Sequence, residues 1–210
     1  ILNYAKVTGL ITEDKKTTGV ILTDSLSRKE YHIRCAVVIN ATGVFTNDVL
    51  QMDQPHQPPL VTPSQGVHIV LDKKFYPGKD ALMIPRTTDG RVLFAVPWHD
   101  RVLVGTTDTP LEKISLEPAA LDAEIKFILH NISTYLNTAI TKADVLSVFA
   151  GLPPLVKIKG VNKTSLIPRD HNILISKSGL ITITGGKWTT YRKMAKEVID
   201  KGMLTGKLPK

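Results

Sequence analysis

A glycine pair followed at once by a lysine is the first group of residues in this sequence with the chemistry of a binding site. In the stretch ITITGGKWTT, residues 181–190, a β-rich run breaks at Gly185 and Gly186 and continues with Lys187. A glycine-rich turn between a strand and a helix presents backbone N–H groups at the positive end of the helix dipole. Such a turn attracts an anion.

The same turn does not fit a nucleoside-triphosphate loop. A P-loop needs a glycine five residues before its second glycine, and a Ser or Thr directly after its lysine. Those positions hold Ile181 and Trp188. The alternative that Gly185 and Gly186 form only a tight connection stays open at this point.

A second turn of this kind ends the apolar run VVINATG, residues 37–43. Gly43 can take a positive φ and let the backbone approach a ligand closely. Because ligands of open α/β sheets bind beyond the carboxyl ends of the strands, the two turns together suggest a dinucleotide. None of the fourteen glycines forms G-x-G-x-x-G, so the usual pyrophosphate turn is absent from these residues.

The composition is that of a globular chain. With 210 residues and 42% hydrophobic content, the chain can form one large domain or two small ones. It has no apolar run of about 20 residues and no signal peptide, which points to the cytoplasm or a membrane surface. The net charge of +8 favours anionic partners, but the basic residues occur singly, unlike those of a nucleic-acid-binding protein. Cys35, within CAVVIN, is expected to be a buried small hydrophobe.

Apolar patterning predicts two sheets and three helices. Short segments over residues 4–40 predict an antiparallel meander and then a fully apolar strand, followed by a helix over residues 44–52. Four prolines between residues 55 and 63 mark a domain crossing. Runs between residues 66 and 108 predict a second antiparallel sheet, with hairpin turns at Asp89-Gly90 and His99-Asp100.

The later helices are predicted from apolar stripes. The segment Pro118 to Asn137 has Pro118 suited to its first turn, and its stripe is Leu121, Ile125, Ile128, Ile132 and Tyr135. Strands are predicted at DVLSVFAG, NILIS and LITIT. The last helix follows the glycine pair, with the stripe Tyr191, Met194, Ala195, Val198 and Ile199.

Six motifs, taken together, resemble those of a known family. They are VVINATG, QGVHIVLD, VPWHDRVLVGTTDTP, SVFAGLPPL, IPRDH and ITITGGKWTTYRKMA. In this order and at these spacings they resemble the flavin-dependent glycerol-3-phosphate dehydrogenases, within the FAD oxidoreductases that are similar to D-amino-acid oxidase. The likeness runs from about Tyr4 to Ile199. GTTD combined with GGKWTTYRK is specific, whereas NATG is shared with many flavoproteins.

The resemblance implies an α+β fold, in which a substrate domain on an antiparallel sheet interrupts a split FAD-binding α/β domain. The implied boundaries are 1–52 and 171–210 for the FAD-binding parts and 53–170 for the substrate domain. It further implies that FAD takes a hydride from C2 of glycerol 3-phosphate to give dihydroxyacetone phosphate, and that electrons pass to membrane quinone. We expect this piece alone to bind FAD weakly and to be inactive, because the pyrophosphate turn is missing from it.

The resemblance also assigns roles to individual residues. His68 is the candidate base for the O2 proton, since histidine has an unperturbed pKa near neutrality, although a histidine in an apolar strand is more often structural. Arg169 and Lys187 are candidate cations at the substrate and catalytic site. Thr106 and Thr107 are candidate substrate contacts, and no metal is expected. The candidate cofactor contacts are Val7, Ala41, Gly43, Gly185, Gly186 and Thr189.

One departure keeps other functions open. The family motif has an arginine where this chain has Pro153, and proline offers neither charge nor donor. The alternatives are a related FAD-dependent amino- or hydroxy-acid oxidase, or a non-catalytic binding module; nucleic-acid binding is not expected. The full-length protein is expected on the inner face of the cell membrane, on the cytoplasmic side, and a homodimer is left open.

Overall fold

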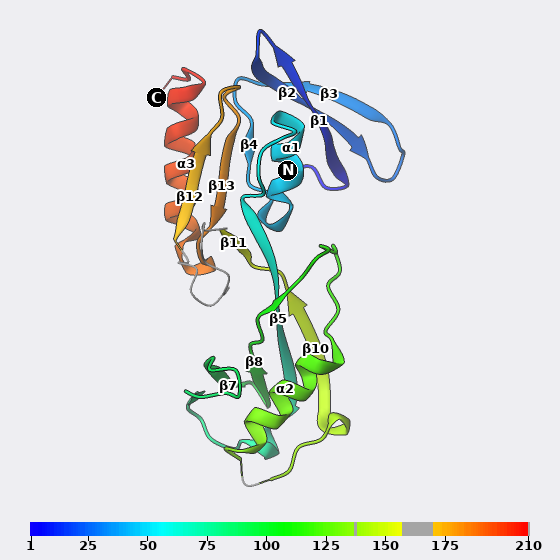
Figure 1. The fold of residues 1–210 in the computed structure, drawn as a ribbon, viewed down its shortest axis with the longest axis vertical. Helices are drawn as coiled ribbons and strands as arrows, with labels where there is room; N and C mark the ends of the chain where they lie inside the picture. Colours follow the sequence, from blue (N-terminus) through cyan, green and yellow to red (C-terminus); the bar gives the residue numbers. More distant parts are fainter. Residues whose placement is uncertain (137, 157–169, 210) are drawn as a thin grey trace. The chain divides into compact units, whose positions relative to one another are not determined.

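The computed structural model describes residues 1–136, 138–156 and 170–209, and Figure 1 shows their fold. The described residues form two compact units. The first contains Ile1–Thr62 and, from later in the chain, residues 154–156 and 170–209. The second contains the described residues from 63 to 153. The chain therefore leaves the first unit once and returns to it, while the boundaries of an FAD domain and a substrate domain stay a prediction.

A three-stranded antiparallel meander opens the first unit, as the sequence predicted. Asp14 and Lys15 join its first two strands, both with left-handed φ angles, 48° and 62°. A two-residue loop with positive φ at both positions matches the twist of a hairpin. The strand order is β1-β2-β3, with the bounds β1 Ala5–Glu13, β2 Lys16–Asp24 and β3 Glu30–Arg34.

The other sheet of the first unit joins distant parts of the chain. In the order β12-β13-β4, β13 runs antiparallel to β12 and parallel to β4. A turn and a helix follow each of the two parallel strands, and Figure 1 shows α3 alongside β12 and β13. The bounds are β4 Ile39–Asn40, η1 Gly43–Phe45, α1 Thr46–Asp53, β11 Pro154–Val156, β12 His171–Ile175, β13 Ile181–Gly185, η5 Trp188–Thr190 and α3 Tyr191–Thr205.

An antiparallel sheet with one long helix forms the second unit, which confirms the predicted second sheet. The strand order is β10-β5-β8-β7-β6, and β9 pairs with the early part of β5. Trp98 pairs with Arg101, so His99 and Asp100 form the predicted hairpin turn. The bounds are β5 Val61–Asp72, η2 Lys73–Phe75, β6 Leu82–Ile84, β7 Leu93–Trp98, β8 Arg101–Gly105, β9 Thr109–Pro110, α2 Asp122–Ser133, η3 Lys142–Asp144 and β10 Val145–Gly151.

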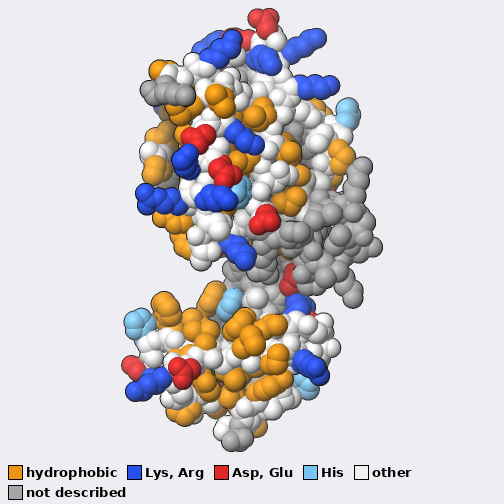
Figure 2. Space-filling model, turned by 90° about the vertical axis from the view of Figure 1, so that its left-hand side faces the viewer, with side chains coloured by type: hydrophobic (Ala, Val, Ile, Leu, Met, Phe, Trp, Pro, Cys, Tyr) orange, Lys and Arg blue, Asp and Glu red, His pale blue; other side chains and the backbone are white. Residues whose placement is uncertain are grey.

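The two faces of this sheet differ in what covers them. Alternate strand residues point to one face, where they pack with Ile125, Ile128 and Ile132 of α2. On the other face, five residues that pair from strand to strand form one row. In order across the sheet they are Met83, Phe94, Gly105, His68 and Phe149. The large apolar side chains of this row, Met83, Phe94 and Phe149, are 57%, 44% and 48% exposed. Figure 2 shows hydrophobic side chains gathered on one side of this unit.

Helix α2 is shorter than the sequence predicted. It begins at Asp122 rather than in a first turn at Pro118, because Leu121 is extended and its N–H donates to Glu124 Oε2 at 2.8 Å. That bond caps the helix from within its own first turn. Leu121 and Tyr135, which flank the helix, are 47% and 43% exposed, so the buried stripe is narrower than expected.

Two other predictions about packing are wrong. Cys35 is exposed, although its N–H donates to the carbonyl of Thr18 at 2.9 Å, and the strand within the apolar run includes only Ile39 and Asn40. In α3 the buried residues are Val198 and Gly202, whereas most of the predicted stripe is exposed. At Gly202 the helix faces Val37, Ile39 and Ile181, whose side-chain atoms lie 3.6–3.9 Å from the position of a Cβ there.

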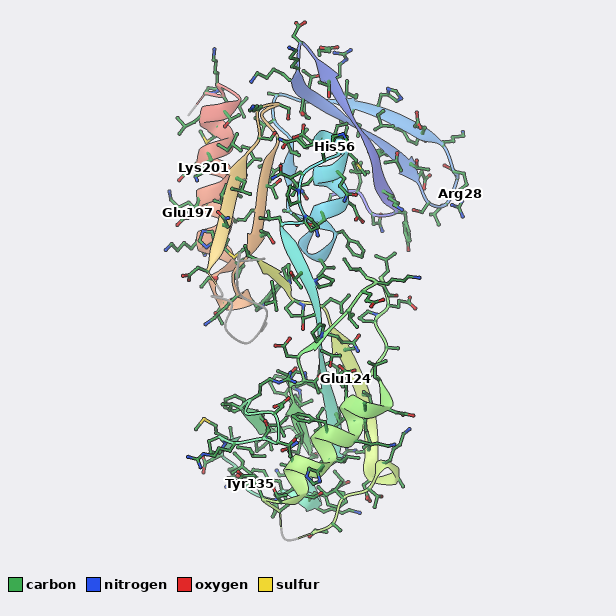
Figure 3. The ribbon with its side chains drawn as sticks, in the orientation of Figure 1. Arg28, His56, Glu124, Tyr135, Glu197 and Lys201 are labelled. Carbon is green, nitrogen blue, oxygen red and sulfur yellow. The ribbon has the colours of Figure 1, made fainter. Side chains whose placement is uncertain are left out.

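A buried carboxylate, Glu124, ties α2 to the sheet. Its side chain is 4% exposed, and Figure 3 labels it near the start of the helix. Oε1 accepts hydrogen bonds from the hydroxyls of Thr107 and Thr109 at 3.1 and 2.6 Å. Oε2 accepts from Gln65 Nε2 at 2.8 Å as well as from the Leu121 N–H. Four donors from three segments therefore depend on one side chain.

Replacing this carboxylate should destabilise the chain strongly. We expect Glu124→Ala to lower the free energy of unfolding by about 3 kcal/mol, because it leaves buried donors without an acceptor. Urea unfolding followed by circular dichroism measures the change. Glu112→Ala, at an exposed glutamate, is the matched control and should change the value by less than about 0.5 kcal/mol. Equal effects of the two variants would contradict the role given to Glu124.

Candidate functional site

The glycine pair of the first unit forms a turn that only glycine fits. Gly185 and Gly186 have φ angles of +77° and +81°. A Cβ at Gly185 would lie 2.6 Å from the carbonyl oxygen of Asp170, and one at Gly186 would lie 2.4 Å from Met194 Sδ. Backbone and side chains therefore crowd one side of the turn, and positive φ excludes other residues on conformational grounds.

Lys187 stands at the start of the helical segment. Its N–H donates to Thr190 Oγ1 at 3.2 Å, and its carbonyl accepts from the same hydroxyl at 2.9 Å. The Lys187 side chain is exposed, as is Thr189. Trp188 is also exposed, and its ring stacks on Tyr191 with centroids 5.7 Å apart. The turn thus leads from β13 through η5 into α3, as the strand–turn–helix prediction requires.

The NATG turn is organised by Asn40, a residue that sequence reasoning missed. Asn40 is buried; its Nδ2 donates to the carbonyl of Thr46 at 3.1 Å, and its Oδ1 accepts from Thr42 Oγ1 at 2.7 Å. The turn leaves Ala41 exposed and gives Gly43 a φ of +61°. A polar residue that closes an apolar strand directly before such a turn was the available signal.

The two turns lie at the same edge of one sheet. Thr182 pairs with Asn40 in the parallel ladder, and Asn40 Nδ2 also reaches Thr182 Oγ1 at 3.4 Å. The two strands run in the same direction, and β13 continues from Thr182 to Gly185, so Ala41 and Gly43 lie at the edge of the sheet that also carries Gly185 and Gly186. Thr184 Oγ1, directly before the glycine pair, is buried and has no hydrogen-bond partner in the described part of the chain. Open α/β sheets bind ligands at such an edge.

A histidine–glutamate hydrogen bond supports the strand and the helix that flank the glycine turn. His171 Nε2 hydrogen-bonds to Glu197 Oε2 at 2.8 Å, which joins β12 to α3, and Figure 3 labels Glu197 on that helix. The hydrogen bond with His171 lowers the pKa of Glu197. His171 pairs with Gly185 across the sheet, so the strand, the turn and the helix are fixed to one another.

In the second unit, His68 lies on the exposed face of the sheet. Its ring is parallel to that of Phe149, with centroids 5.2 Å apart and planes at 3°. It covers the backbone of Gly105, where a Cβ would lie 2.3 Å from His68 Cδ2. The ring is partly buried, and burial lowers the pKa of His68. The neutral form, which a base requires, is thereby favoured.

The two candidate threonines point in different directions. Thr106 Oγ1 lies over Gly66, 2.7 Å from the position of a Cβ there, and Gly66 shares the face of His68 because it is two residues away on β5. Thr107 is 3% exposed; its hydroxyl accepts from the Val67 N–H at 2.9 Å and donates to Glu124. The structure therefore brings Thr106 beside His68 and engages Thr107 in the core.

The remaining candidates are more scattered. Val7 is a partly buried residue of β1 that pairs with Leu22. Pro153 is exposed and follows β10. Arg169 lies outside the described residues. Among the described residues, no cluster of three or more metal-binding side chains occurs, and no helix is long and apolar enough to span a bilayer.

Comparison with protein families identifies this arrangement. Residues 1–192 match the family described as FAD dependent oxidoreductase, DAO. The chain belongs to this family. The family-level prediction of FAD as the cofactor is thereby confirmed. So is the resemblance to glycerol-3-phosphate dehydrogenases, because the curated relatives with high identity carry that name.

Three relatives place this DAO-family chain more closely. It is 41% identical to a mitochondrial glycerol-3-phosphate dehydrogenase of Arabidopsis thaliana, over 99% of this chain and 33% of the relative. It is 40% identical to the mouse (Mus musculus) mitochondrial enzyme, over 94% of this chain and 28% of the relative. The glycerol-3-phosphate dehydrogenase from Bacillus halodurans, solved with FAD, matches with a TM-score of 0.83 and 32% identity, over 97% of this chain and 39% of that one. The chain spans about a third of the length of these relatives.

The glycine turn should not tolerate a side chain. We expect Gly186→Ala to lower the free energy of unfolding by about 2 kcal/mol, because the new Cβ meets Met194 in a conformation that disfavours alanine. Gly151→Ala is the control, since a Cβ there meets nothing within 4 Å and its φ is not positive. Urea unfolding compares the two, and a Gly186→Ala chain as stable as the Gly151→Ala chain would show that the turn is not constrained.

Proposed function

We propose that this chain is part of an FAD-dependent glycerol-3-phosphate dehydrogenase. The reaction is the oxidation of sn-glycerol 3-phosphate to dihydroxyacetone phosphate, with hydride transfer to FAD and onward electron transfer to membrane quinone. The observation that carries the proposal is the parallel pairing of β4 with β13, which sets two glycine turns at one sheet edge. The names of the relatives and the FAD complex of the Bacillus halodurans enzyme support it.

The described residues fit the flavin side of such a cofactor. Gly185 and Gly186 leave backbone without side chains at the sheet edge, and Thr184 Oγ1 supplies a buried hydroxyl without a partner in the described segments. Ala41, Gly43 and Thr189 complete the proposed contacts, and Val7 is proposed for the adenine end. When bound, FAD supplies a hydride acceptor. Residues 1–210 contain no pyrophosphate turn, and we therefore still predict that they bind FAD weakly by themselves.

The chemistry assigned to this chain is binding and proton transfer. We assign the removal of the O2 proton of glycerol 3-phosphate to the neutral imidazole of His68, as the C2 hydrogen leaves with its electron pair. Lys187 and Arg169 are proposed to hold the phosphate, and Thr106 and Thr107 to contact the substrate. The hydroxyl of Thr106 donates to the carbonyl of Thr107 at 3.1 Å, but it is the better placed of the two, since the buried hydroxyl of Thr107 bonds both Val67 and Glu124.

Removing the base should abolish most turnover and change its pH dependence. In the full-length gene product, we expect His68→Gln to lower kcat about 10²- to 10³-fold with glycerol 3-phosphate and a dye acceptor. Because burial lowers the pKa of His68, activity of the unmodified enzyme should persist below pH 6.5 and fall as the pH drops through that lowered value. His56→Gln, at an exposed histidine, is the control. Unchanged turnover in His68→Gln would exclude this residue as the base.

The alternative functions are separated by the same assay. A related amino- or hydroxy-acid oxidase would turn over its carboxylate substrate and stay silent with glycerol 3-phosphate. The structure of a glycine oxidase from Bacillus cereus resembles the chain with a TM-score of 0.62, but at 18% identity this likeness shows the fold alone. We further propose peripheral attachment to the inner face of the cell membrane, where quinone is available.

Pro153 is the observation that favours a non-catalytic binding module. It is exposed at the end of β10, where the family resemblance expects a guanidinium. We expect Pro153→Arg in the full-length gene product to raise kcat/KM for glycerol 3-phosphate about tenfold, because a charge-assisted contact to the phosphate is gained. Pro153→Gln, which restores a donor without charge, is the control. Absence of turnover in both the unmodified protein and Pro153→Arg would favour the binding module.

A further inference from the structure

The imidazole of His68 is enclosed by two neighbours that the proposed reaction does not use. Across the sheet, His68 pairs with Phe149 on one side and with Gly105 on the other. Directly opposite residues of adjacent strands share a face and lie close enough for their side chains to touch. The orientation of the histidine is therefore decided by these two strands.

On the β8 side, the ring rests on bare backbone. A Cβ built on Gly105 would lie 2.3 Å from Cδ2, 2.6 Å from Cγ and 2.7 Å from Nε2 of His68. These are the ring atoms nearest to that position, so the Cγ–Cδ2–Nε2 edge faces Gly105 and the Nδ1 side is farther from it. Any side chain at this position would push the imidazole away from the sheet.

On the β10 side, the ring is covered by Phe149. The two rings are parallel within 3°, and the 5.2 Å between centroids indicates an offset stack. Phe149 is 48% exposed and does not belong to the core, which takes Val145, Val148 and Ala150 from the same strand. The ring contact of Phe149 in the described structure is therefore the stack on His68 rather than a contact with the core.

We propose that Phe149 is a positioning residue, which holds the His68 imidazole in one orientation against Gly105 and shields one face of it from water. This inference rests on the proposed role of His68 as the base. A base contributes fully only when its nitrogen is fixed at the proton that it removes, because small misplacements cost large factors in rate. The stack supplies this constraint from a side chain that lies outside the hydrophobic core.

The electrostatics around the ring agree with shielding. Burial is the cause of the lowered pKa of His68, and no charged group of the described residues contributes to it. The neighbours that face the ring from β8 and β10, Gly105 and Phe149, are uncharged, as is Thr106 beside them. Removing Phe149 admits water to one face of the ring, so the pKa of His68 should rise towards its ordinary value.

The cross-strand row also provides a matched control. Phe94 pairs with Gly105 from the other side, in the same row as Phe149, and is 44% exposed. Its ring is not stacked on His68 in the described structure. Phe94→Leu therefore removes an equivalent aromatic ring from the same exposed face without uncovering the stacked side of the imidazole.

The first experiment measures the histidine itself. The Cε1 proton of His68 is titrated by NMR in the 210-residue chain and assigned by its loss in His68→Gln. We expect Phe149→Leu to raise the pKa of His68 and to remove the ring-current shift of this resonance, whereas Phe149→Trp keeps both near the original values. Phe94→Leu should leave both unchanged. Identical titrations in Phe149→Leu and the unmodified chain, or an equal change in Phe94→Leu, overturn the proposal.

The second experiment measures the consequence for turnover in the full-length gene product. We expect Phe149→Leu to lower kcat about tenfold with little change in KM. The ratio of kcat/KM at pH 6 to kcat/KM at pH 8 should also be at least about twofold lower than in the unmodified protein. Phe149→Trp should restore both. Unchanged kcat despite an altered titration overturns the positioning role. If no variant, nor the unmodified protein, oxidises glycerol 3-phosphate, the proposed function fails, while the titration still decides whether Phe149 holds the ring.

Discussion

The first unit depends on a short parallel pairing between β4 and β13. Only two residues of each strand pair, Ile39 with Ile181 and Asn40 with Thr182, and they are 142 positions apart in the chain. The entropy of closing so long a loop rises only slowly with its length, so a few buried hydrogen bonds and the apolar contacts of Ile181 suffice to offset it once the intervening residues fold by themselves. The second unit meets that condition with its own core.

The two faces of the second sheet have different roles, and neighbouring residues of one segment lie on opposite faces. Val67 and Thr107 lie on the face that packs against α2. There the Val67 N–H donates to the Thr107 hydroxyl, which donates to Glu124, and these buried contacts stabilise the unit. His68 and Thr106 point the other way and form a polar patch among exposed aromatic rings. Because a strand alternates its side chains, the catalytic candidates are held by backbone that the core makes rigid, without having to pack in the core themselves.

Much of this architecture follows from the sequence, and its failures have physical reasons. The hairpin at His99 and Asp100 and the strand–turn–helix at Gly185 were predictable because turn chemistry is local. The start of α2 was not predictable in this way. Pro118 favours a first helical turn locally, but the Leu121 N–H donates to the Glu124 carboxylate, and the helix begins after Leu121. Cys35 was misjudged because an apolar run indicates burial only where a neighbouring strand covers it.

The candidate site was predictable in its residue types and less so in its partners. Motif resemblance pointed to His68, but the stack on Phe149 joins two strands whose pairing partners no motif reveals. Asn40 was overlooked because one buried amide in a turn has no distinctive spacing. The placement of Arg169 lies outside the described residues, so its part in phosphate binding stays a prediction.

The contact between His68 and Gly105 also restricts how this sequence can diverge. Every missense change from a glycine codon adds a Cβ, and at position 105 each would meet the imidazole. Drift by single steps is therefore blocked there for as long as the histidine keeps its orientation. Among descendants of this gene, Gly105 should change only where His68 has also changed, so a side chain at position 105 would mark the loss of the proposed proton-transfer role.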